Sequence, residues 1–422
     1  MRILLVTQHY PPFIGGAHRW AELLAHGLAR RGHEVNVVTE WQRGLSGEEQ
    51  VGAVTVHRVR QLRTPVPRLI RDGRQRYAPP FPDPLVVRDI RTVIAATRPE
   101  VALSHGWITF SAMVALARDR IPMLMSAHDY GYFCATQTLL NNGATCSGPA
   151  PLKCVRCAAD FYGGLPKGAT TVAGVALSRQ ILRRRTAGVQ TVSSFVDEVT
   201  WRNVFSEGDE TRVRRYVIPA FLDDDPPSHV TTEGSVDSYL DQLPKEPFIM
   251  FVGALRRLKG LHILLDAYCM LKDRPPLVLM GTFEPDTPKR FPRGTIVLAD
   301  VPHAAVMAAW KRAMFGVVPS VWPEPLGTVA IECVSQGTPV IISAPSGMVD
   351  VVGDDAGLIV KQGDVAGLAD AMQMLADDPA LRERLGSAGI GRAARFQAQV
   401  VLTEYERALG DLVADRSGAP LA

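Results

Sequence analysis

Apolar and polar residues alternate along the first forty positions in a way that predicts a parallel α/β sheet. The apolar run Arg2–Val6 is interpreted as a buried strand. After a loop of prolines and glycines, apolar residues recur at the i, i+3, i+4 spacing of an amphipathic helix: Trp20, Leu23, Leu24, Gly27 and Leu28. A second apolar run, Val35–Thr39, completes a strand–helix–strand unit. Because both runs are continuously apolar, we expect these strands in a parallel sheet with helices on both faces.

The alternation continues through residues 1–222 and predicts a first doubly wound, Rossmann-like domain. The expected helices lie near 84–97 and 108–119, and the expected strands are Val101–Ser104, Pro122–Ser126 and Val189–Ser193. Acidic residues and prolines interrupt the rhythm between residues 223 and 247, which makes this stretch the best candidate for a linker.

A second doubly wound domain is expected from residue 248 to 397. Its expected strands are Phe248–Val252, Leu277–Met280, Gly316–Pro319 and Pro339–Ser343. Its expected helices are 260–272, 303–313, 328–336, 364–377 and 380–393. A last helical segment, 398–422, could pack back on the first domain. Two such domains would face each other across a cleft at the carboxyl ends of their strands, where open sheets bind ligands.

The composition is that of a globular protein and excludes a disordered or fibrous one. A chain of 422 residues is too long for one hydrophobic core and fits two domains. No apolar run approaches the ~18 residues that a membrane span requires. The apolar start, Met1–Val6, is too short for a signal peptide, and we therefore expect a cytoplasmic protein.

The net charge of +3 hides an uneven distribution along the chain. Residues 1–222 carry 28 Lys or Arg against 17 Asp or Glu, whereas the remaining residues carry 18 against 26. Either the two halves bind different partners, or the difference in charge lies on solvated surfaces and has no functional meaning.

Three loops lie at the carboxyl ends of expected strands and have residues suited to phosphate. The first is Gly15-Gly16, where glycine allows close backbone approach and the following helix N-terminus attracts an anion; the alternative is a tight turn. The second is Val252–Gly260, in which Arg256, Arg257 and Lys259 could neutralise a diphosphate. A solvated basic turn is the alternative, and the P-loop spacing is missing.

The third loop, Pro319–Glu332, carries two glutamates eight residues apart. Glu324 lies in a loop rich in proline, and Glu332 lies one turn into a helix expected to begin near Thr328. Backbone amides at that helix start would point at a phosphate, namely those of Leu326, Gly327 and Thr328. Glu332 could accept hydrogen bonds from both hydroxyls of a ribose, and Glu324 would lie nearer the transferred sugar.

Taken in order, these motifs resemble family 4 of the nucleotide-sugar glycosyltransferases, retaining enzymes with the GT-B fold of two Rossmann-like domains. The signature is Glu324-x₇-Glu332, preceded by Pro319-Ser320 and followed by Gly337–Ile341. The lysine loop, Gly15-Gly16 and His128-Asp129 stand where that family has them. Four motifs therefore agree over nearly the whole chain.

The resemblance implies roles for individual residues. The donor phosphates would be bound by Lys259 together with Gly16, Arg256, Arg257, Leu326, Gly327 and Thr328. The nucleotide would be bound by Gly253, Val301 and Glu332, and the catalytic residues would be His128 and Glu324. His128 would lie beside the transferred sugar on the acceptor side, unless it is merely structural. The family usually has an arginine where this chain has Ala254, so either Arg256 or Arg257 substitutes or the phosphates are bound differently.

The implied reaction moves a sugar from a nucleotide-diphosphate sugar to a saccharide, a lipid-linked intermediate or a small metabolite, and requires no cofactor. A departing phosphate oxygen would take the acceptor proton, so that attack on the leaving-group face retains the anomeric configuration. Positive groups would stabilise the diphosphate in place of a metal ion. One alternative is a nucleotide-sugar epimerase of the same architecture. Another is a catalytically degenerate binding module, suggested by Ala254.

Four of the six cysteines fall close together, as Cys134-x₁₁-Cys146-x₇-Cys154-x₂-Cys157, in a stretch interpreted as a loop. Because a cytoplasmic chain should not depend on disulfides, a structural zinc ion or an iron–sulfur cluster is one hypothesis. Free thiols or redox-labile pairs are the other.

Two arginine-rich stretches lie in the first half. One holds Arg58, Arg60, Arg63, Arg68, Arg71, Arg74 and Arg76, and the other holds Arg179, Arg183, Arg184 and Arg185 on an expected helix. They could meet anionic lipid headgroups or a phosphorylated acceptor, or form a solvated surface. Nucleic acid is not expected as a partner, and membrane contact is expected to be peripheral at most.

Overall fold

The computed structural model describes residues 1–12, 16–62, 80–222 and 236–418, and the chain divides into two compact units. The first unit comprises Met1–Asn141, Cys146–Pro219 and Val401–Ala422, and the second comprises Asn142–Thr145 and Ala220–Val400. Part of the expected linker (223–235), Gly15 and Arg63 to Arg76 lie outside the described residues. Within those residues, no helix has the length and apolarity needed to cross a bilayer.

The first unit is built on an eight-stranded sheet whose centre is apolar. In spatial order its strands are β10 (Arg214–Val217), β9 (Gly188–Thr191), β6 (Met123–Ala127), β5 (Val101–His105), β1 (Arg2–Thr7), β2 (Glu34–Glu40), β4 (Val54–Val59) and β3 (Glu48–Val51). Only β3 runs antiparallel to its neighbour. The order reverses between β5 and β1, so the loops after these two strands adjoin at a switch point.

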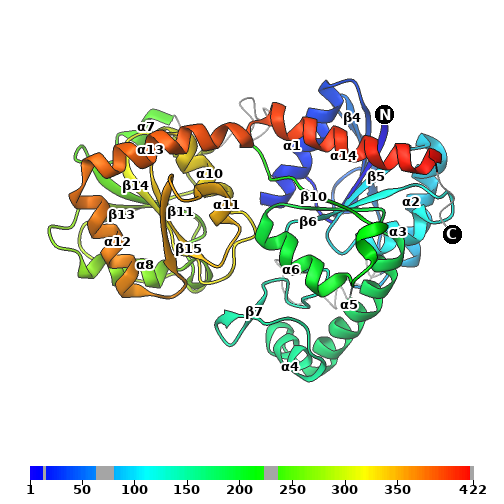
Figure 1. Ribbon diagram of the computed structural model, residues 1–422, viewed down its shortest axis with the longest axis horizontal. Helices are drawn as coiled ribbons and strands as arrows, with labels where there is room; N and C mark the ends of the chain where they lie inside the picture. The colour runs from blue at the N-terminus through cyan, green and yellow to red at the C-terminus, as the bar shows by residue number, and fades with distance from the viewer. Residues whose placement is uncertain (13–15, 63–79, 223–235, 419–422) are drawn as a thin grey trace. The chain divides into compact units, whose positions relative to one another are not determined.

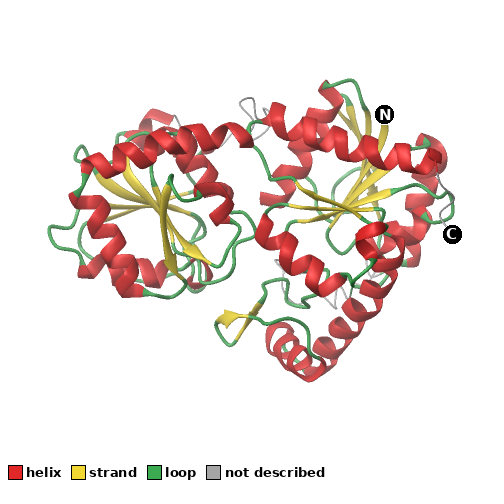
Figure 2. Ribbon diagram, viewed as in Figure 1, coloured by secondary structure: helices red, strands yellow, loops and turns green. Residues whose placement is uncertain are grey.

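Helices cover both faces of this sheet (Figure 2). They are α1 (Gly16–Arg30), α2 (Pro84–Thr97), α3 (Thr109–Leu116), α5 (Leu165–Arg185), α6 (Ser194–Val204) and α14 (Ala398–Gly418), while α4 (Pro151–Tyr162) packs on α5. Helix α2 shows why such a sequence folds locally: the Asp83 carboxylate accepts from the N–H groups of Leu85 and Val86 and caps the helix. A short hairpin, β7 (Leu140–Asn141) and β8 (Ala144–Thr145), precedes α4.

The second unit has a fully parallel six-stranded sheet. The spatial order is β13 (Thr295–Ala299), β12 (Leu277–Gly281), β11 (Phe248–Val252), β14 (Ala313–Val318), β15 (Val340–Ala344) and β16 (Gly357–Lys361). This is the 3-2-1-4-5-6 order of a dinucleotide-binding sheet, which reverses between β11 and β14. The helices are α7 (Val236–Leu240), α8 (Leu261–Met270), α9 (His303–Trp310), α10 (Thr328–Ser335), α11 (Met348–Val352), α12 (Val365–Asp377) and α13 (Pro379–Ala393). The core joins buried side chains of both layers, Phe251, Leu264, Tyr268 and Phe315 among them.

The C-terminal helix belongs to the first unit from Val401 onward (Figure 1). Tyr405 is fully buried, with its ring 6.2 Å from that of Trp20 in α1. Glu406 Oε2 accepts from Arg31 at 2.6 Å, and Asp411 Oδ2 accepts from the Tyr216 hydroxyl at 2.9 Å. Burial of an aromatic side chain of this kind stabilises a fold by about 1.5–3 kcal/mol.

The expected fold class is confirmed, and so are the central strands, which match the expected ranges to within a few residues. Five strands of the two large sheets were missed, β3, β4, β10, β13 and β16, and so was the short hairpin β7–β8. Four of them are the edges of the two sheets. An edge strand is covered less completely than a central one, and β3, for example, has three exposed residues in four. Strand β3 therefore lacks the continuous apolar run on which the prediction relied, whereas β13 and β16 have such a run and were missed all the same.

Candidate active site

The loops that follow β11 and β14 meet at the switch point of the second sheet. Gly260 has a φ of +74°, and a Cβ on it would lie 1.8 Å from the carbonyl oxygen of Pro319, so only glycine fits. The N–H of Val321 donates to the carbonyl of Leu258 at 3.2 Å. These contacts place Lys259 beside the loop that carries Glu324.

Lys259 and Glu324 form an ion pair. The ammonium Nζ lies 2.6 Å from Glu324 Oε1, and it stands 5.6 Å from the ring centre of Trp322. Ser320 Oγ and Trp322 Nε1 also donate to Oε1, both at 2.8 Å. With 5% of its surface exposed, Glu324 is therefore a buried carboxylate held in one orientation by three donors.

The helix expected at 260–272 is α8 (Leu261–Met270), and a short turn that was not expected precedes it. Arg257–Lys259 form a 3₁₀ turn, and α8 begins only at Leu261. The Arg257 N–H donates to Asp286 at 2.8 Å, and the Nε of Arg256 is buried without a hydrogen-bond partner among the described residues. The turn thus holds the backbone of Lys259 in one conformation. Gly253, with a φ of +145°, begins the loop.

Helix α10 begins at Thr328, as expected, directly after Leu326 and Gly327. Gly327 has a φ of +72° and packs on Met348, where a Cβ would lie 2.5 Å from Cγ. The first turn of an α-helix has N–H groups without partners inside the helix, which makes this end of α10 suited to an anion.

Glu332 lies one turn into α10 and is 8% exposed. Its Oε1 is 3.0 Å from Nε2 of His303, the first residue of α9. Val301 precedes this histidine by two residues, between β13 and α9. His303 was not predicted, because a single histidine at a helix start carries no sequence signal of its own. Ser320 and Trp322 were likewise missed as partners of Glu324, although Ser320 stood in the quoted motif.

His128 follows β6 in the first unit and lies among aromatic rings. Its ring centre is 4.0 Å from that of Trp20 and 4.9 Å from that of His105. The Nε2 atom is buried and has no hydrogen-bond partner in the described part of the chain. Burial lowers the pKa of His128 well below its ordinary value, and His105 lowers it further. The imidazole is therefore neutral, able to donate one hydrogen bond and accept another.

Asp129, the neighbour of His128, is held by a turn. Its Oδ1 accepts from the N–H of Gly131 at 2.7 Å, and the Gly131 carbonyl accepts from Trp107 Nε1 at 2.9 Å. Burial raises the pKa of Asp129 to about 6, and the Gly131 N–H opposes that shift. Gly16, the remaining candidate of this unit, is the first residue of α1.

Comparisons with known proteins match both halves of the chain. The family model "Glycosyltransferase Family 4" matches residues 14–202, and "Glycosyl transferases group 1" matches residues 240–392. Together they include every strand of the second sheet, most of the first sheet and every motif described above. The chain belongs to glycosyltransferase family 4.

Two curated relatives agree with this assignment. Glycogen synthase of Mycobacterium tuberculosis is 26% identical over 428 residues, which cover 96% of this chain and 93% of that protein. D-inositol 3-phosphate glycosyltransferase of Corynebacterium aurimucosum is 31% identical over 180 residues, or 42% of its length. This protein is thus a nucleotide-sugar glycosyltransferase, and nothing in the comparisons favours the epimerase or the degenerate binding module.

Solved structures show that the glycosyltransferase has the GT-B fold. Sucrose-phosphate synthase from Thermosynechococcus elongatus superposes with a TM-score of 0.70 at 19% identity, covering 98% of this chain and all of that one. Anabaena HepE in complex with UDP-glucose gives 0.66 at 14% identity, covering 97% of this chain and all of the other.

The cysteine-rich segment of this glycosyltransferase is not a loop throughout. Cys154 and Cys157 lie on α4, one turn apart. All six cysteines are free, and burial raises the pKa of Cys157, with Cys134, Cys146 and Cys154 adding to the rise. Across the described ranges, no set of three His, Cys, Asp or Glu side chains is arranged to hold a metal ion. The metal site therefore stays a prediction.

Proposed function

We propose that this glycosyltransferase binds its nucleotide-diphosphate sugar on the second unit, around Lys259, Glu324 and α10, and transfers the sugar with retention of configuration. The 2.6 Å contact of Lys259 with Glu324 carries the proposal, since it joins a cation suited to diphosphate with a carboxylate suited to sugar hydroxyls. Glu324 precedes by four residues the helix start at Thr328, which attracts negative charge.

The ribose is assigned to Glu332. A buried carboxylate next to His303 can accept hydrogen bonds from two vicinal hydroxyls, and the 3.0 Å contact orients its Oε1. Gly253 follows β11 and Val301 follows β13, both at the carboxyl edge of the parallel sheet, and the two residues would line the base. Arg256 or Arg257 would supply the positive charge that Ala254 does not.

The chemistry follows from where charge develops. The bond between the anomeric carbon and the phosphate oxygen breaks, the acceptor oxygen bonds to that carbon, and the acceptor proton passes to the departing diphosphate. Lys259, the arginines and the amides of α10 stabilise the charge on the diphosphate. Attack on the leaving-group face retains the configuration, and no step uses a cofactor.

His128 is assigned to the transferred sugar on the acceptor side. A neutral imidazole with an unpartnered Nε2 can hydrogen-bond a sugar hydroxyl without introducing charge. Gly16 would approach the donor phosphates through its backbone. The acceptor is proposed as a saccharide hydroxyl, lipid-linked or on a small metabolite, and the cytoplasmic location stays a prediction.

A donor panel tests this function. The unfolding temperature is measured with nucleotide sugars that differ in base and sugar, beginning with UDP-glucose, which HepE binds. We expect one nucleotide to stabilise the protein, and slow release of nucleoside diphosphate without acceptor. Isomerised sugar with no release would contradict the proposal, and so would binding of none of the nucleotides.

We also propose that the four clustered cysteines hold a structural zinc ion. The Cys157 Sγ lies 3.6 Å from the carbonyl of Leu140, and the Cys146 N–H donates to the neighbouring carbonyl of Leu139, so both cysteines border the same short strand. Zinc per mole of purified protein should be near one and fall in Cys154→Ser, while Cys269→Ser, at an exposed cysteine, serves as control. Iron with visible absorption would indicate a cluster instead, and equal metal in both variants would overturn the site.

A further inference from the structure

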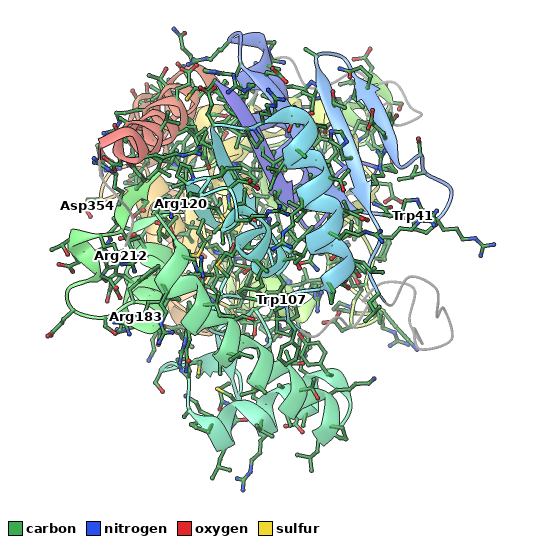
Figure 3. The ribbon with its side chains drawn as sticks, turned by 90° about the vertical axis from the view of Figure 1, so that its right-hand side faces the viewer. Trp41, Trp107, Arg120, Arg183, Arg212 and Asp354 are labelled. Atoms are coloured by element: carbon green, nitrogen blue, oxygen red, sulfur yellow. The ribbon has the colours of Figure 1, made fainter. Side chains whose placement is uncertain are left out.

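Helices α4 and α5 form a hairpin that extends from the body of the first unit (Figure 1). They pack along each other through small residues, with Ala158 and Ala159 buried on α4 and Gly168 on α5. The C-terminal half of α5 joins the rest of the unit: Ser178 donates to the carbonyl of Pro80 at 2.7 Å, and Arg183 contacts Asp209. Figure 3 shows Arg183 and Arg212 at this junction, with the hairpin at the lower edge of the view.

The hairpin exposes large apolar side chains. Leu152 is 78% exposed, Leu165 64%, Leu177 51% and Phe161 46%. These are four of the twelve exposed large apolar residues in the described part of the chain. The exposed residues of α5 include the apolar Leu165, Ala169, Ala173, Ala176 and Leu177, together with Pro166, Lys167, Thr170, Gln180, Arg184 and Arg185. Large apolar side chains of both helices are therefore left in contact with water.

The same hairpin is strongly basic. Residues 151–185 hold seven Lys or Arg and a single acidic residue, Asp160. Arg179 and Arg183 anchor α5, the first on the carbonyl of Asn203 and the second on Asp209. The exposed cations of the two helices are Arg156, Lys167, Arg184 and Arg185.

We propose that the α4–α5 hairpin is a docking surface for an anionic lipid bilayer, on which the two helices lie in the headgroup region. Exposed leucines and a phenylalanine next to Lys and Arg, with one acidic residue among them, suit the boundary between anionic headgroups and acyl chains. A second copy of this chain would bring the same excess of positive charge against the surface. Nucleic acid would neutralise the cations but leave the leucines and the phenylalanine exposed. The proposal is independent of the sugar donor and of the transfer reaction.

Sedimentation with vesicles tests the surface on the full-length protein. Two vesicle preparations are compared, phosphatidylcholine alone and phosphatidylcholine mixed with phosphatidylglycerol, at low and high salt. We expect binding to the mixed vesicles only, weakened by salt. Replacing two cations, Arg156→Gln with Arg184→Gln, should lower the partition coefficient about thirtyfold, at ~1 kcal/mol for each charge. The matched control is Lys289→Gln with Arg290→Gln, two exposed cations of the second unit.

The exposed apolar side chains are tested separately. Leu152→Ser with Leu165→Ser should also reduce binding, whereas Met374→Ser, at an exposed residue of the second unit, should not. Turnover with a water-soluble acceptor should be equal in all variants, which shows that they are folded. No binding to mixed vesicles, equal binding to both preparations, or duplex DNA retained in place of vesicles would each overturn the proposal.

Discussion

The ammonium of Lys259 lies 2.6 Å from Oε1 of Glu324, across two loops that touch at Gly260 and Pro319. The two residues are separated by 65 positions in the chain. The ion pair therefore depends on the contact between the backbones of their two loops. Two central strands of the second sheet, β11 and β14, bring their loops together, and the absence of a Cβ at Gly260 lets them close.

Replacing Lys259 by alanine should reduce kcat/KM for the donor about 100-fold or more, since one positive donor to the departing diphosphate is lost. Steady-state kinetics with the donor found in the panel measure this. Lys272→Ala, at an exposed lysine of the same unit, is the control. Equal kcat/KM for the two variants would show that Lys259 does not bind the donor.

Gly260→Ala should disturb both stability and transfer. The added Cβ would collide with the Pro319 carbonyl, and φ is unfavourable for alanine, so the free energy of unfolding should fall by about 2–4 kcal/mol. Gly363→Ala is the matched control: its φ is +77°, but no atom lies within 4 Å of the new Cβ, and about 1 kcal/mol is expected. Denaturant unfolding compares the two. Similar losses would mean that the loops relax without cost.

Glu332→Ala separates nucleoside recognition from phosphate recognition. Loss of a charged hydrogen-bond acceptor should weaken nucleoside diphosphate binding about tenfold to a hundredfold, and leave inorganic diphosphate unaffected. Lys259→Ala should weaken the binding of both nucleoside diphosphate and inorganic diphosphate. Calorimetric titration of each ligand provides the comparison, with Glu383→Ala on α13 as control. If Glu332→Ala weakens the binding of inorganic diphosphate as much as that of the nucleotide, the carboxylate does not bind the ribose.

Asp129→Asn should stabilise the protein, and only above acidic pH. The folded pKa of about 6 exceeds the ordinary value of 3.8, so the folded state holds a proton that the unfolded state releases between these values. Stability is therefore lost as pH rises from about 4 to 6, and ionisation costs about 3 kcal/mol above that range. The asparagine variant removes this cost while its amide oxygen still accepts from Gly131. The difference in unfolding free energy should grow through that window and then level off; a flat difference would refute it.

The sequence predicts the centre of each sheet well and its borders poorly. Runs such as Phe248–Val252 are buried on both faces, so their composition identifies them. In the edge strand β16 (Gly357–Lys361) only Gly357 is buried, and the pairing of such a strand depends on the sheet already being present.

The candidate site divides in the same way. Lys259, Glu324 and Glu332 stand in recognisable motifs and could be singled out as donor residues from the sequence. The turn at Arg257–Lys259 and the approach of His303 to Glu332 could not, because both depend on tertiary contacts between segments distant in sequence. Helix α4 was missed because prolines, glycines and cysteines around it resemble a loop.

The return of α14 to the first unit has a consequence for biosynthesis. That unit is assembled from both ends of the chain, with the whole second unit encoded between them. During translation, Trp20 is synthesised long before Tyr405, the residue whose ring packs near it. The second unit can therefore fold first, and the first unit is completed only when α14 has been made.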